Sequence, residues 1–131
     1  MKWDWQPNIG IGHLKFNKTI DLASLGYGLQ KFNKFEECNQ KTYLLVNEGS
    51  SITIQGSNVF IDLECSNYCY FNEENLIGMT VKRFIQVIKK EHENVLIEIT
   101  PNYISIDELG IMIWPNQDYV ESVVVYKCLD L

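Results

Sequence analysis

The residues that follow Thr80 constrain the fold most strongly, because their apolar side chains recur with the period of an α-helix. The apolar positions, spaced i, i+3, i+4 and i+7, are Val81, Phe84, Ile85 and Ile88. The polar and basic positions between them are Lys82, Arg83, Gln86, Lys89 and Lys90. Thr80 is a favourable N-cap residue, and the pattern ends near residues 91–94. The segment predicts an amphipathic helix of about three turns that buries one face.

Most of the remaining chain alternates apolar and polar residues, which is the period of a strand with one buried face. The segments with this pattern are residues 43–47, 51–55, 58–65, 95–100, 103–106, 110–114 and 119–127. Turns rich in Gly, Pro, Asn and Asp separate them, including 115–118 and a hairpin turn that ends at Gly110, where a positive φ is needed. We expect residues 1–131 to form a single domain of the α+β class. Its core would be one curved antiparallel sheet of about six to eight strands, with one or two helices packed on one face.

The N-terminal part of the chain has weaker patterns. A short strand is expected over residues 10–16, after a glycine turn. Thr19 can cap a second helix that runs to about Leu25, where Gly26 and Gly28 would close it. A chain of 131 residues is long enough for one hydrophobic core and too short for two comfortable ones.

The cysteines and the N-terminus predict a cytoplasmic protein without a metal or other cofactor. Residues 1–7 lack the apolar core of a signal peptide, and no apolar run approaches the roughly 18 residues of a membrane span. In the cytosol we expect free thiols at all cysteines, which are Cys38, Cys65, Cys69 and Cys128. A zinc site would use Cys65 and Cys69 with another Cys or His, but structural zinc sites usually show two tight ligand pairs and this chain offers one.

No motif in the chain predicts an enzyme. Gly10-x-Gly12 lacks the third glycine of a dinucleotide fingerprint and precedes the apolar strand residues, so it cannot place a phosphate on a helix. Phosphate-loop, nucleophile-elbow and zinc-protease motifs are absent. A nucleophile such as Cys65 paired with His13 stays open as an alternative, because such pairing depends on the fold.

The charges of this chain, whose net charge is −6, are segregated along the sequence. Residues 42–81 and 91–126 contain no Lys or Arg, although they hold most of the carboxylates. The basic residues gather instead in residues 2–41 and 82–90, with Lys127 alone outside. An acidic face of this kind repels nucleic acid and attracts a basic protein through long-range steering.

Aromatic and acidic residues occur together in the regions without cations, and such a mixture suits contact with Arg-rich or Lys-rich protein. The candidate binding residues around the last hairpins are Asp107, Glu108, Trp114, Asp118, Tyr119 and Glu121. A second candidate patch comprises Tyr68, Tyr70, Glu73 and Glu74. For each single residue a solvated surface charge or a core ring is the simpler interpretation. The collective pattern favours a protein-binding surface.

The order of these elements resembles a group of small bacterial α+β proteins. The matching segments are the Gly-x-Gly strand at 10–16, the capped helix at 19–28, the helix entry at 76–80, the hairpin at 103–111 and the apolar strand at 120–126. Many members of the group look like immunity proteins of polymorphic-toxin or contact-dependent growth-inhibition systems. The group has no shared active-site signature, so the resemblance implies a role and assigns no functional residues.

The implied role is that of an antitoxin, which binds a cognate toxin in the cytosol and blocks it. A basic nuclease domain is the expected partner, because nucleases that bind phosphates are basic and an acidic inhibitor can cover their cleft. We expect no contact with nucleic acid or membrane, and a monomer when the protein is free. The alternative is a small-ligand-binding domain with an apolar pocket between sheet and helix.

Overall fold

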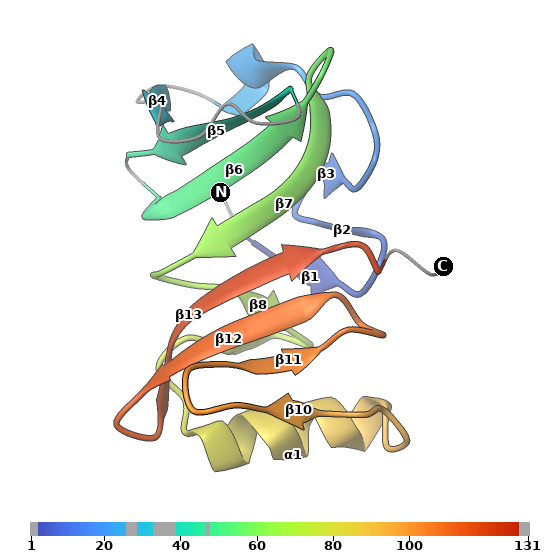
Figure 1. Cartoon of the computed structure of the whole chain (residues 1–131), viewed down its shortest axis with the longest axis vertical. Helices are drawn as coiled ribbons and strands as arrows, with labels where there is room; N and C mark the ends of the chain where they lie inside the picture. Colours follow the sequence, from blue (N-terminus) through green and yellow to red (C-terminus); the bar gives the residue numbers. More distant parts are fainter. Residues whose placement is uncertain (1–2, 26–28, 33–38, 47, 129–131) are drawn as a thin grey trace.

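In the computed structural model, an antiparallel sheet of eight strands runs along the length of the molecule (Figure 1). The structure describes residues 3–25, 29–32, 39–46 and 48–128. In spatial order the strands are β10 (Glu98–Ile99), β11 (Ile104–Ile106), β12 (Ile111–Asn116), β13 (Tyr119–Tyr126), β7 (Val59–Cys65), β6 (Ser50–Gln55), β5 (Gln40–Leu45) and β4 (Leu29–Phe32). Strands β4 to β7 and β10 to β13 are two meanders, which join where β13 pairs with β7. The expected α+β class with an antiparallel sheet is confirmed.

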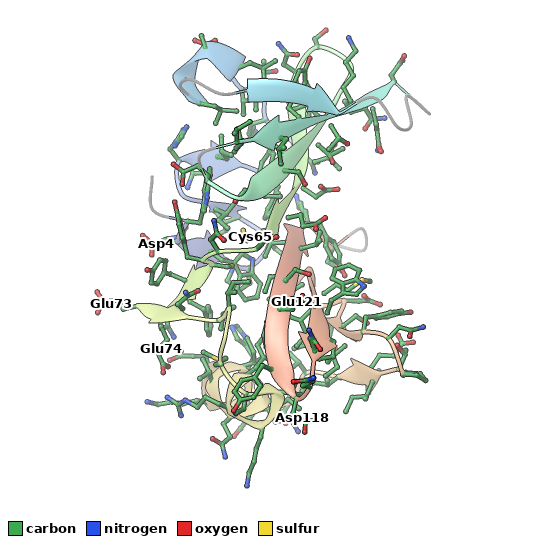
Figure 2. All side chains as sticks on the ribbon, turned by 90° about the vertical axis from the view of Figure 1, so that its left-hand side faces the viewer. Asp4, Cys65, Glu73, Glu74, Asp118 and Glu121 are labelled. Atoms are coloured by element: carbon green, nitrogen blue, oxygen red, sulfur yellow. The ribbon has the colours of Figure 1, made fainter. Side chains whose placement is uncertain are left out.

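Smaller elements cover one face of this sheet. They are a three-stranded sheet of β1 (Trp5–Gln6), β2 (Gly10–Ile11) and β3 (Leu14–Lys15), the hairpin β8 (Tyr70–Phe71) and β9 (Glu74–Asn75), and helix α1 (Val81–Glu91). In Figure 2, where the main sheet is seen from its side, these elements lie to the left of β13. The rings of Trp5 and Phe71, 5.3 Å apart between centroids, join β1 to β8. No described helix or strand packs on the other face of the main sheet (Figures 1 and 2).

Cross-strand pairing explains which side chains reach the covered face. Ile113 pairs with Val123, and Val125 pairs with Leu63; all four side chains are fully buried. Side chains alternate along a strand, so the residues between these positions point to the uncovered face. The core on the covered side therefore follows directly from the alternation that the sequence shows.

Helix α1 forms where the helical period predicts it. The Thr80 hydroxyl accepts a hydrogen bond from the backbone N–H of Arg83 at 3.1 Å, so Thr80 is the N-cap. The helix ends at Glu91, and His92 is its C-cap, whose N–H bonds the carbonyl of Ile88. Phe84, Val87 and Ile88 are buried. Of the expected apolar stripe, Phe84 and Ile88 are buried, whereas Val81 and Ile85 are half-buried. Val87 is buried although the expected stripe did not include it, and the lysines are exposed.

The expected helix at residues 19–25 is wrong, because only Leu22–Leu25 form a single 3₁₀ turn. Residue Thr19 instead makes a β-bridge with Val59, and the Ile20 N–H bonds the carbonyl of Asn58 at 2.8 Å. This pairing with the start of β7 holds the backbone extended where a helix would begin. The expected closing residues Gly26 and Gly28 lie outside the described residues.

Several turns also differ from expectation. Pro115 and Asn116, expected as a turn, belong to β12, and the turn consists of Gln117 and Asp118 with φ values of 51° and 69°. Pro115 is accommodated because the register shifts between Trp114 and Pro115, and Pro is tolerated at such bulges. The strand expected at 95–100 is only Glu98–Ile99.

Candidate protein-binding surface

The uncovered side of the main sheet displays outward side chains of β10 to β13 and β7. One row across these strands is Glu98, Ser105, Met112, Val124 and Glu64. Flanking pairs are Trp114 with Ser122 and Tyr126 with Asp62. We call these residues together the open face. Its side chains are mainly half-buried or exposed, as expected for a sheet surface that meets solvent.

The centre of the open face is apolar and aromatic. Met112, Trp114 and Val124 are half-buried there, and the ring of Tyr103 lies 6.5 Å from that of Trp114. Leu96, just before β10, is 76% exposed, which is high for a leucine. Met and large aromatic residues are enriched in the centres of protein interfaces, so this composition is typical of a contact surface.

Two exposed carboxylates, Glu98 and Glu64, lie at the two ends of the row that crosses this centre. Strands β6, β7 and β10 to β13 contain no Lys or Arg, whereas α1 carries Lys82, Arg83, Lys89 and Lys90 on its exposed side. The fold therefore places the acidic segments of the sequence together on the sheet and a basic cluster on the helix.

The turn between β11 and β12 uses its two carboxylates for structure. The Tyr126 hydroxyl donates to Asp107 Oδ1 at 3.0 Å, and the Leu96 N–H donates to Glu108 Oε1 at 3.3 Å. The pKa of the Tyr126 hydroxyl is raised, chiefly by burial and further by its bond to Asp107. The Asn8 side chain donates to the carbonyl of Glu108 at 2.8 Å. Changes at Asp107 or Glu108 would therefore disturb the fold as well as any partner.

Other predicted residues lie at the opposite end of β12 and β13. The carbonyl of Asp118 accepts from the Val81 N–H at 2.8 Å, which holds the turn at the start of α1. Glu74 on β9 makes an ion pair of 2.7 Å with Arg83 on the same helix. In Figure 2, Asp4, Glu73 and Glu74 lie on the left, Asp118 at the lower end and Glu121 on β13; we call these five residues, seen from one side of the molecule, the acidic flank. Nearby Tyr119 is 54% exposed.

Tyr68 and Tyr70 extend the acidic flank only in part. Their ring centroids are 6.1 Å apart, and both side chains are half-buried. The Tyr68 hydroxyl donates to the carboxylate of Glu48, which fixes that hydroxyl inside the protein. The Tyr68 and Tyr70 rings therefore add apolar surface to the acidic flank, and the Tyr68 hydroxyl is already engaged.

The structure regroups the predicted residues. Asp118, Tyr119 and Glu121 lie with Glu73 and Glu74 on one flank, whereas Asp107 and Glu108 lie at the far end of the same strands. Trp114 alone belongs to the open face. Open-face residues that the sequence interpretation missed are Met112, Val124, Tyr126, Asp62, Glu64 and Glu98. The sequence signal that could have found them is the alternation along each strand, because the residues between the buried positions point to the other face of the sheet.

A hollow of about 460 Å³ opens beside the Tyr126–Asp62 pair. Its lining includes polar groups from Asn17, Gln40, Gln55, Asp62 and Lys127. Burial raises the pKa of the Asp62 carboxyl, and Glu64 raises it further, while the hydrogen bond from Thr53 opposes the shift. Ile61, Tyr126 and Cys128 complete its lining, and no residue of α1 contributes, so it does not lie between the sheet and the helix.

The structure places the described cysteines and His13 in different environments, and Cys128 is a half-buried free thiol. Cys65 and Cys69 are fully buried free thiols, and the pKa of Cys69 is raised well above its usual range by its hydrogen bond with Cys65 and by burial. A buried thiol in its neutral form is a poor nucleophile. His13 is exposed in the turn between β2 and β3. Cys38 lies outside the described residues, and among the described ones no three His, Cys, Asp or Glu are grouped to hold a metal ion.

Comparison with protein-family models, with curated proteins and with solved structures finds no match to this chain. Within the described residues, no helix is long and apolar enough to cross a membrane. The function proposed for the protein therefore depends on the chemistry of its surface.

Proposed function

We propose that this protein is an immunity protein that acts in the bacterial cytoplasm, where it binds a cognate toxin and occludes the toxin's active site. The observation that carries the proposal is the open face, which combines an apolar, aromatic centre with carboxylates and has no Lys or Arg on its strands. An uncovered sheet face of this composition suits a protein partner, because burying Met112 and Trp114 is favourable and the carboxylates select the partner's charge.

The charge distribution supports a basic nuclease domain as the toxin. A nuclease binds phosphates through Lys and Arg, so the cleft it must keep open is positive. The acidic strands attract such a cleft and accelerate encounter, and they repel nucleic acid itself. The same charges disfavour an anionic membrane surface. When free, the protein is a monomer in this proposal.

The proposed action is binding rather than catalysis. The thiols of Cys65 and Cys69 are inaccessible, and the exposed carboxylates are spread over a surface instead of converging on a cleft. For the small-ligand alternative, Phe84, Val87 and Ile88 of α1 fill the space against the sheet. No observation favours an apolar ligand there.

The test begins with the genes on either side of this one. An immunity gene is expected beside a gene for a large secreted protein with a variable C-terminal domain. That C-terminal domain is expressed in cells with and without this protein, and survival is counted. The binding of the purified protein to the purified toxin domain, immobilised on a sensor surface, is then measured at increasing salt concentration. We expect rescue of growth, tight binding and an association rate that falls as salt rises.

Matched charge variants show whether the acidic flank accelerates the association with the toxin. Asp118→Asn with Glu121→Gln removes two exposed carboxylates, and Asn tolerates the positive φ at residue 118. We expect slower association, weaker protection and an unchanged melting temperature. The control, Lys89→Gln with Lys90→Gln on α1, should not slow association. A neighbouring toxin domain that is neither bound nor neutralised, or binding indifferent to salt, contradicts the proposal.

A further inference from the structure

A small hollow on the open side of the sheet is framed by charged and apolar groups from four neighbouring segments. Its volume is about 80 Å³, and it is lined by Leu96, Glu98, Ser105, Asp107 and Glu108. These residues come from the segment before β10, from β10 and β11, and from the turn after β11. Ser105 pairs with Met112, so the hollow borders the apolar centre of the open face.

Ser105 is the one buried residue in the lining of this hollow. It is 3% exposed, and within the described part of the chain its hydroxyl makes no hydrogen bond to another protein group. The fully enclosed side-chain atoms without a partner among the described residues are the ring nitrogens of Trp3 and Trp5, so the Ser105 hydroxyl still borders the open space of the hollow. Ser50, which is 2% exposed, instead bonds the carbonyl of Glu48 at 3.4 Å. The Ser105 hydroxyl is therefore available to a group that enters the hollow.

The carboxylates around the hollow retain free acceptor sites. Asp107 receives the Tyr126 hydroxyl on Oδ1, and Glu108 receives the Leu96 N–H on Oε1, which leaves the other oxygen of each. Glu98 is exposed. No three of the described carboxylates are grouped closely enough for a metal ion. Acceptors that are spread apart fit a guanidinium, whose five N–H donors diverge in a plane.

Leu96 supplies the apolar part of the same site. Its side chain is 76% exposed beside the carboxylates. An arginine inserted between them would lay its aliphatic stem on an apolar neighbour while its head meets the charges, as amphipathic side chains commonly do. We propose that this hollow receives an arginine side chain of the basic toxin, with the surrounding partner surface packed on Met112 and Trp114. The inference rests on the proposed function and names the contact that holds the complex.

The arginine contact in the hollow should control the dissociation rate of the complex, whereas the acidic flank should control its association rate. A desolvated charge pair at an interface controls dissociation, whereas exposed rim charges control association. The probe is the toxin domain encoded beside the gene, and the kinetics of each variant are measured against it. Glu98→Gln and Leu96→Ala should each raise the dissociation rate about tenfold. Glu64→Gln, in the same row but outside the hollow, should only slow association.

Ser105→Ala provides the sharpest test. If the hydroxyl serves only the fold, its removal should destabilise the free protein. If it awaits an arginine, the free protein should be at least as stable as wild type, while the complex dissociates several-fold faster. Ser51→Ala, in the same row on β6, is the matched control and should change neither quantity.

The outcomes separate this inference from the proposed function. A wild-type protein that does not bind the toxin overturns both. Tight wild-type binding with unchanged dissociation in Glu98→Gln, Leu96→Ala and Ser105→Ala overturns the hollow and leaves the immunity function standing. Faster dissociation in those variants, with Glu64→Gln and Ser51→Ala unaffected in dissociation, supports it.

Discussion

Asp62 is a carboxylate that the fold holds in an unfavourable place. Burial raises its pKa above the ordinary value of 3.8. Between the ordinary and the raised pKa, the folded state therefore retains a proton that the unfolded chain has lost. The free energy of unfolding of the wild type falls as pH rises through this range, and it stays lower at neutral pH. Asp62→Asn removes the charge but can still accept from Thr53. We expect it to raise the free energy of unfolding at pH 7, with no gain below the ordinary pKa.

Urea unfolding of both proteins across acid and neutral pH measures this difference. Glu121→Gln serves as the control, because Glu121 is exposed and is not among the groups that shift the pKa of Asp62. Equal pH profiles for wild type and Asp62→Asn would show that the carboxylate is as well solvated in the fold as in the unfolded chain.

Burial at single residues could largely be predicted, but side-chain partners could not. Ile52, Ile113 and Val123 lie in segments predicted as strands with one buried face, and all three are fully buried. The bonds from Tyr126 to Asp107 and from Tyr68 to Glu48 join residues separated by intervening strands and turns. Such pairs depend on the register between strands, which no local pattern specifies.

Two glycine turns allow the cost of backbone strain to be separated from that of a clash. Gly56 has φ +56° with nothing within 4 Å of an added Cβ, whereas at Gly110, with φ +71°, a Cβ would lie 1.9 Å from the Tyr126 carbonyl oxygen. Gly56→Ala should cost about 1–2 kcal/mol from the left-handed backbone alone. Gly110→Ala should cost more, about 3 kcal/mol or above, because the β11–β12 turn must also move away from β13. Denaturant unfolding gives both values.

Equal losses for the two glycine variants would contradict the close approach at Gly110. The turn that contains Gly110 also frames the hollow through Asp107 and Glu108. Gly110→Ala should therefore weaken toxin binding as well, while Gly56→Ala should leave it unchanged. This second readout links the geometry of the turn to the proposed contact.

At the scale of elements, length decided what could be predicted. Helix α1 agrees with its period, because its turns repeat one pattern and Thr80 marks the start. The strands β1, β2, β3, β8 and β9 have two residues each, too few for alternation to be recognised. The β8–β9 turn adds to the difficulty, since Asn72 and Glu73 adopt positive φ values of 48° and 68° without a glycine. Because these short strands and their turn could not be predicted, the sequence did not show that Glu73 and Glu74 belong to the acidic flank.

At the scale of the whole molecule, the pairing of β13 with β7 joins the two meanders into one sheet. The two strands are far apart in the sequence, and neither strand carries a local pattern that predicts their pairing. It nevertheless places Glu64 beside Val124 and so completes the open face. The segregation of charge was visible in the sequence, but its arrangement around an apolar centre required the sheet order.

The same pairing predicts that the molecule unfolds as one unit. A single cluster of buried side chains includes Trp3 and Trp5 of the N-terminal layer together with Phe84 of α1. Phe84 is 1% exposed, so Phe84→Ala should lower the free energy of unfolding by about 3–5 kcal/mol. Lys82→Ala, exposed on the same helix, should change it by less than about 0.5 kcal/mol.

In a Trp114→Phe background, where Trp3 and Trp5 are the remaining tryptophans, fluorescence reports on the N-terminal layer, and far-ultraviolet circular dichroism reports on α1 and the strands. If one core holds all these elements, the two signals must change at the same denaturant concentration in this background, and both must shift together when Phe84→Ala is added. Loss of the helical signal before the fluorescence changes would mean that α1 unfolds alone. In that case the prediction of a single domain would be wrong. A coincident shift in both signals means that a side chain on the helix stabilises tryptophans in the N-terminal layer, which only a shared core can do.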